Sequence, residues 1–100
     1  MAPPRLLDVD LRGLHVPPSR ASGADPAKLQ RQIAQFGVST VGMPAIWVYE
    51  GTDGALEIYN GVTRATRVAK LSAGTLVRVE VIGRLGGPVG HLPTVGDRLP

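Results

Sequence analysis

The chain has 100 residues, 43% hydrophobic and 19% charged, which fits one small soluble domain with a thin core. It contains no cysteine, which excludes disulfide scaffolds, thiolate metal sites and a thiol nucleophile. No apolar run approaches the roughly 20 residues that span a bilayer, and the N-terminus lacks the apolar stretch of a signal peptide. We therefore expect a cytoplasmic protein with no membrane partner. The net charge is +3 and most basic residues are arginine, which suits an anionic ligand but also follows from a GC-rich coding sequence.

The first half of the chain predicts a strand and a helix joined by a loop. Hydrophobic and charged residues alternate within 5–12, the period of a half-buried strand. Residues 13–23 contain prolines, serines and glycines and are predicted to form a loop. Asp25 and Pro26 then serve as N-cap and first residue of a helix, and Gly37 ends it. One face of this helix is apolar and consists of Leu29, Ile33 and Phe36.

The second half predicts a hairpin, a second helix and a last strand. Two stretches rich in β-forming residues, 45–49 and 56–59, flank the turn signal Asp53-Gly54. A helical period covers 62–71, and alternation returns over 75–82. The buried side of the helix is expected to hold Val62, Ala65, Val68, Ala69 and Leu71. The expected fold class is α+β, a small mixed sheet with a hairpin and two main helices.

The Gly- and Pro-rich stretch 85–100 is expected to be a C-terminal tail to a domain formed by residues 1–84. It either packs as an irregular strap or stays mobile.

Residues 58–67 join a strand, a glycine turn and the start of a helix that carries a hydroxyl and two arginines. The first turn of a helix has unpaired N–H groups and the positive end of the helix dipole, and both attract phosphate. Thr63 adds a hydroxyl donor and Arg64 a guanidinium fork. The pattern predicts an anion site centred on Gly61. An ordinary hairpin-to-helix turn, with glycine supplying a positive φ, is the alternative.

The order of elements over about residues 6–83 resembles the ParB/sulfiredoxin-like superfamily. The matching blocks are the loop Pro17-Pro18-Ser19-Arg20, the helix ending at Gly37, the strand after Pro44, the hairpin, and the turn Gly61-Val62-Thr63-Arg64. The resemblance implies a ParB-like domain that binds phosphate of a nucleotide or nucleic acid. On that reading Gly61, Thr63 and Arg64 hold the phosphate, and Arg20 and Arg67 approach it. Some members of the superfamily are described as nucleases or toxin domains.

This sequence differs from the motifs of the superfamily at two points, and each difference removes a function that the resemblance would otherwise imply. ParB-type members have Gly-Glu-Arg-Arg at this turn, whereas here Val62 replaces the glutamate and Thr63 the first basic residue. The nucleotide-linked switching of ParB relatives is therefore not carried over. The sulfiredoxin cysteine is absent, which excludes sulfinic-acid reduction.

Whether the protein is an enzyme stays open from the sequence. A small nuclease or toxin effector would use the same turn, with His15, Asp8 and Asp10 as weak catalytic candidates. A solvated strand face explains the two aspartates equally. No metal site is predicted from the residues, and Mg²⁺ would be the companion of a bound nucleotide.

Two further expectations concern partners. A non-catalytic interaction module, with the tail docking a protein, is the second alternative function. The exposed edge of the hairpin could pair across a two-fold axis, so a homodimer is kept open.

The aromatic residues of the hairpin offer one more pair of interpretations. Trp47 and Tyr49 are two residues apart and share a strand face, with Tyr59 on the return strand. We expect them to fill or edge the core. Stacking on a nucleic-acid base is the alternative.

Overall fold

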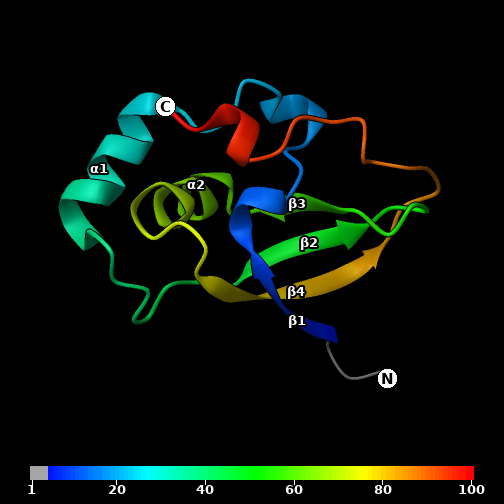
Figure 1. The fold of residues 1–100 in the computed structure, drawn as a ribbon, viewed down its shortest axis with the longest axis horizontal. Helices are drawn as coiled ribbons and strands as arrows, with labels where there is room; N and C mark the ends of the chain where they lie inside the picture. The colour runs from blue at the N-terminus through cyan, green and yellow to red at the C-terminus, as the bar shows by residue number, and fades with distance from the viewer. Residues whose placement is uncertain (1–4) are drawn as a thin grey trace.

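Four strands and two helices make up most of the computed structural model, which describes residues 5–100 (Figure 1). In chain order they are β1 (Arg5–Asp10), α1 (Pro26–Phe36), β2 (Ile46–Glu50), β3 (Leu56–Asn60), α2 (Val62–Leu71) and β4 (Leu76–Arg84). The α+β class, the hairpin and the two main helices are confirmed. Asp25 caps α1 through its carboxylate, which accepts a hydrogen bond from the backbone N–H of Lys28, and Gly37 ends the helix as predicted.

The strands form one mixed sheet in the order β1-β4-β2-β3. β1 runs antiparallel to β4, β2 runs antiparallel to β3, and β2 and β4 are parallel. The outer edge of β3 is partly covered, because the backbone N–H of His15 donates to Leu56 and the N–H of Ile58 donates to His15. His15 in turn forms an isolated bridge with Thr94. Part of the hairpin edge is therefore occupied within the chain itself.

The strand ends differ slightly from the prediction. β1 stops at Asp10 instead of residue 12, because the Asp10 carboxylate accepts a hydrogen bond from the N–H of Arg12 and starts a 3₁₀ turn, Leu11–Gly13. The turn directs Leu11 into the core. β2 and β4 are also shifted by one or two residues from the predicted 45–49 and 75–82.

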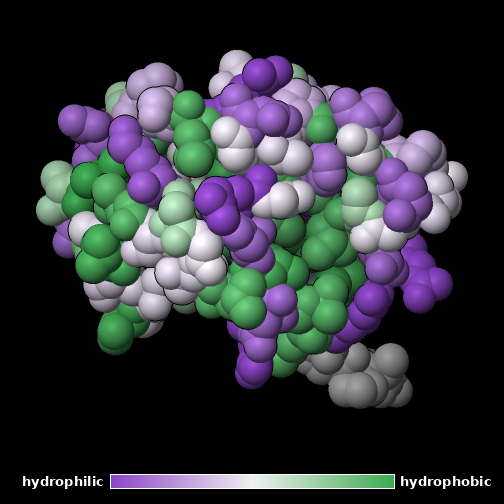
Figure 2. Space-filling view, in the orientation of Figure 1, coloured by the Kyte–Doolittle hydropathy of each residue, from purple (hydrophilic) through white to green (hydrophobic). Residues whose placement is uncertain are grey.

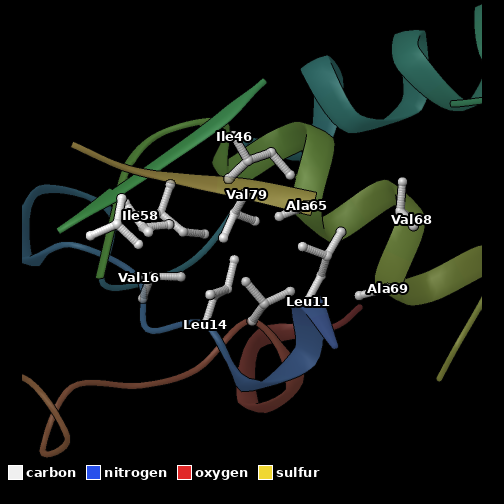
Figure 3. Close-up of a cluster of buried hydrophobic side chains, with 12 residues drawn as sticks. Leu11, Leu14, Val16, Ile46, Ile58, Ala65, Val68, Ala69 and Val79 are labelled. Carbon is white, nitrogen blue, oxygen red and sulfur yellow. The ribbon is translucent and has the colours of Figure 1, made fainter. Parts of the chain in front are cut away.

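The core lies on one face of the sheet, where α2 and residues 11–16 meet it (Figure 3). The sheet contributes inward-facing aliphatic side chains, and α2 contributes Ala65, Val68 and Ala69, as predicted. Leu71, also expected there, is 36% exposed at the end of the helix. Leu11, Leu14 and Val16, from the segment that follows β1, complete the core.

The C-terminal segment packs as an irregular strap, the first of the two outcomes expected for it. It runs beside the segment that follows β1 (Figure 1), where Val16 donates to Pro93 and Val95 donates to Leu14, both at 2.8 Å. Val95 is buried in the core. The Asp53 carboxylate in the β2–β3 turn also accepts hydrogen bonds from the N–H groups of Val89 and Gly90. The strap is thus fixed at two separate places.

Trp47 and Tyr59 do not join the core, which corrects the expectation from the sequence. They are 39% and 58% exposed and lie on the sheet face opposite α2. Ile46, Val48 and Ile58 point into the core. Because successive side chains of a strand point to opposite faces of the sheet, the neighbouring aromatic side chains point away from the core.

Hydrophobic residues also reach the surface in the loop between α1 and β2. This loop projects at the lower left of Figure 1, and apolar surface is visible there in Figure 2. Val38 and Val41 in this loop are 66% and 91% exposed. Over residues 5–100, neither helix has the length and apolar character needed to cross a bilayer.

Candidate phosphate site

A pocket of about 260 Å³ lies at the N-terminal end of α2. We call it the α2 pocket. Its walls come from the loop before α1, from α1 itself, from the end of β3 and from the first turn of α2. The lining residues are Pro17, Ser19, Arg20, Lys28, Gln32, Tyr59, Asn60, Gly61, Val62, Thr63 and Arg64.

Gly61 makes the turn that positions the helix end at this pocket. Its φ is +121°, a backbone conformation that side chains with a Cβ rarely adopt. A Cβ there would also lie 3.1 Å from Arg64 Nη2 and 3.1 Å from Ile46 Cγ1. Gly61 has no side chain to cap α2, so the N–H groups of the first turn are available to a ligand.

Three cationic side chains reach the α2 pocket from three different segments. Arg20 belongs to a 3₁₀ turn, Pro18–Arg20; Lys28 lies on α1; Arg64 lies on α2. No aspartate or glutamate lines the pocket. The positive end of the α2 dipole therefore adds to three side-chain charges without a carboxylate among the lining groups to offset them.

Arg64 is the most constrained of the three cations. Its Nη2 donates to the backbone oxygen of Ala45 at 3.1 Å, while its buried Nε has no hydrogen-bond partner among residues 5–100. Burial lowers the pKa of Arg64 below its ordinary value, because desolvation disfavours the charged form. An anion beside this guanidinium would offset part of that cost.

The structure brings together four of the five residues predicted to bind phosphate: Gly61, Thr63, Arg64 and Arg20 all line the α2 pocket. Arg67, the fifth, lies elsewhere. It is 1% exposed, and its Nη1 donates to the backbone oxygens of Gly37 and Ser39. It lines a separate pocket of about 190 Å³, which also contains Phe36 and Met43.

The surroundings of Arg67 explain how its charge is accommodated without a carboxylate. Gly37 is the C-cap of α1, so its carbonyl belongs to the negative end of that helix dipole. The Arg67 guanidinium also lies 5.4 Å from the centre of the Phe36 ring. Arg67 therefore joins α2 to the end of α1 instead of facing the α2 pocket.

The three weak catalytic candidates lie outside the α2 pocket and have partners of their own. Asp8 pairs with Arg78 at 3.1 Å, and Asp10 pairs with Arg12 at 2.6 Å. His15 is half-buried, with Nδ1 2.8 Å from the backbone oxygen of Leu92. Within residues 5–100 no group of three or more His, Asp or Glu side chains is arranged to hold a metal ion.

Ser19, Lys28 and Gln32 line the α2 pocket but were not predicted as site residues. Lys28 and Gln32 are four residues apart and therefore lie on the same side of α1. This spacing could have indicated that the two side chains act together, although it does not show which side of α1 approaches α2. No sequence pattern pointed to Ser19 as a pocket residue.

Comparisons of the chain with protein-family models, with curated proteins and with solved structures give no match.

Proposed function

We propose that this protein is a binding module for the phosphate of a nucleotide or nucleic acid, with the phosphate held in the α2 pocket. The observation that carries the proposal is the convergence of Arg20, Lys28 and Arg64 on one helix N-terminus, with no carboxylate among the lining residues. A helix N-terminus alone is common in proteins. Three cations from separate segments around it form an arrangement that suits a multiply charged anion.

Each part of the pocket has a role in this proposal. The N–H groups of the first turn of α2 and the Thr63 hydroxyl donate to phosphate oxygens. Arg64 is already partly desolvated, so its interaction with an anion is less screened by water than that of a surface arginine. Arg20 and Lys28 are exposed and close over the bound group.

The same proposal includes membership of the ParB/sulfiredoxin-like superfamily. The supporting observations are the element order and the Gly61–Arg64 turn at the start of α2. A nucleotide bound here would bring Mg²⁺ on its own phosphates. Binding is proposed in preference to nuclease activity, since His15, Asp8 and Asp10 lie outside the α2 pocket.

The test compares two double variants that remove the same charge. The pocket variant, Arg20→Ala with Lys28→Ala, removes two of the three cations that line the α2 pocket. The control variant, Arg31→Ala with Lys70→Ala, removes two exposed cations that do not line it. Binding of pyrophosphate and of nucleoside triphosphates is measured by calorimetry and by thermal shift. A ligand at about 100 times its Kd adds about 2.7 kcal/mol to the stability of the wild-type protein.

We expect the pocket variant to weaken binding about tenfold or more, while the control variant binds like the wild type. Equal losses in both variants would show that only the overall charge matters. Absence of any phosphate ligand for the wild type would leave the interaction-module hypothesis as the better account.

A further inference from the structure

Within residues 5–100, no helix or strap covers the sheet face opposite the core. Besides Leu76 at the far end of β4, four hydrophobic side chains on this face remain at least 39% exposed: Leu6, Trp47, Tyr59 and Ile82. Register places them together, because Leu6 and Trp47 both neighbour Glu80 on β4. We call this surface the outer sheet face. Contiguous exposed apolar patches are typical of interaction surfaces, whereas apolar side chains scattered singly over a surface are not.

Tyr59 connects the outer sheet face to the α2 pocket. Its ring is nearly parallel to that of Trp47, with an interplanar angle of 10° and centroids 6.5 Å apart, and Tyr49 meets it edge-on at 5.4 Å. The same Tyr59 lines the α2 pocket. A group stacked on Tyr59 would therefore be adjacent to a phosphate bound there.

An irregularity in the hairpin places Tyr59 at this junction. Val48 pairs with Ile58, but Trp47 pairs with Asn60, so β3 has one residue more than β2 between the two pairs. Such a bulge bends a strand and redirects a side chain. It occurs immediately before the turn at Gly61, where the sheet meets α2.

Charge divides the two surfaces into a phosphate side and a base side. Three cations line the α2 pocket, whereas the outer sheet face carries Glu57, opposite Tyr49, and Glu80, opposite Trp47. An arginine on this face, Arg78, is paired with Asp8 at 3.1 Å. A phosphate backbone running across these glutamates would be repelled. Uncharged planar groups can stack on the rings beside them.

We infer that the ligand is a single-stranded nucleic acid whose phosphate occupies the α2 pocket while the adjoining base stacks on Tyr59. The inference rests on the proposed function and names its substrate class. Stacking on exposed aromatic rings beside a cationic groove is how proteins hold single strands, because the unpaired bases are free to leave their own stack. The outer sheet face extends from Tyr59 to Trp47, so it offers a place for a neighbouring base as well.

The test uses the only tryptophan, Trp47, as a reporter. A thymidine oligonucleotide, its duplex with the adenosine complement, thymidine monophosphate and pyrophosphate are titrated while Trp47 fluorescence is followed. We expect the single strand to quench the fluorescence and to bind more tightly than the duplex or the mononucleotide. Its affinity should fall with added salt.

The decisive variant is Tyr59→Ala, which removes an exposed ring. It should weaken binding of the single strand about 5-fold or more. Because Tyr59 also lines the α2 pocket, pyrophosphate, which has no base to stack, should lose affinity too, but by a smaller factor. Tyr59→Phe keeps the ring and should bind like the wild type. Leu76→Ala removes a 64% exposed side chain at the far end of β4 and serves as the control.

The outcomes separate this inference from the function on which it rests. Unchanged binding of the single strand by Tyr59→Ala, or equal affinity for the strand and the mononucleotide, overturns the inference while phosphate binding stands. Failure of the wild type to bind pyrophosphate and nucleotides removes both. Self-association through the outer sheet face, seen as a dimer in sedimentation that Tyr59→Ala abolishes, assigns the face to a second copy instead.

Discussion

At the scale of single residues, Arg67 and Arg64 show how one helical turn separates a structural arginine from a candidate ligand-binding one. The two are three positions apart on α2 and lie on the same side of the helix, but Arg67 is about one turn further from the N-terminus and reaches the end of α1. The sequence pattern placed both at the phosphate because it identified the helix end correctly but not which segment packs against each turn of the helix. The packing partner of α2 is tertiary information that a local pattern does not contain.

The structural role of Arg67 leads to a prediction about stability. Arg67→Met should lower the free energy of unfolding by about 3 kcal/mol, because it removes charged hydrogen bonds and leaves the carbonyls of Gly37 and Ser39 without their donor. Urea unfolding measures the change. The exposed Arg31→Met should cost no more than about 0.5 kcal/mol. Similar small costs for both variants would contradict the role given to Arg67.

At the scale of elements, the β2–β3 turn does more than close a hairpin. The sequence predicted the hairpin from Asp53-Gly54, since that signal is local. It did not predict that the Asp53 carboxylate accepts hydrogen bonds from Val89 and Gly90, more than 35 residues along the chain. Gly51 and Gly90 leave room for this contact: a Cβ at either position would lie within 2.8 Å of a carboxylate oxygen.

The turn therefore makes stability depend on pH. Hydrogen bonds from backbone N–H groups, that of Gly90 first, lower the pKa of Asp53 below its ordinary value. The stabilisation is complete above the unfolded-state pKa of about 3.9 and disappears as pH falls through the lower folded-state value.

Asp53→Asn should accordingly be less stable than the wild type at neutral pH, and the difference should shrink in acid. Thermal unfolding between neutral pH and about pH 2 measures it, with Glu80→Gln as a control for loss of a carboxylate from the sheet. A difference that does not change with pH would show that the carboxylate's charge plays no part in holding the strap.

At the scale of the whole molecule, the sequence predicted the elements better than their arrangement. Each helix and strand follows from residues close together in the chain, so their order and approximate bounds are confirmed. The sheet order β1-β4-β2-β3 and the exposure of Trp47 and Tyr59 depend on which face meets α2. The same applies to the α2 pocket. A local motif was enough to predict Gly61, Thr63 and Arg64 as site residues, whereas the approach of Lys28 depends on how α1 packs against α2.

The pairing of β1 with β4 also bears on folding speed. Asp8 and Arg78 are 70 residues apart in the chain, and His15 and Leu92 are 77 apart, so loops of most of the chain must close before these contacts form. Such high contact order predicts refolding over about milliseconds to seconds, slower than the microseconds of helical bundles of similar length. Stopped-flow dilution from urea, followed through Trp47 fluorescence, measures the rate, and a microsecond phase that completes refolding would contradict this expectation. During that interval both edges of the β2–β3 hairpin are unpaired, so the protein has its greatest tendency to aggregate before β4 and the segment around His15 have docked.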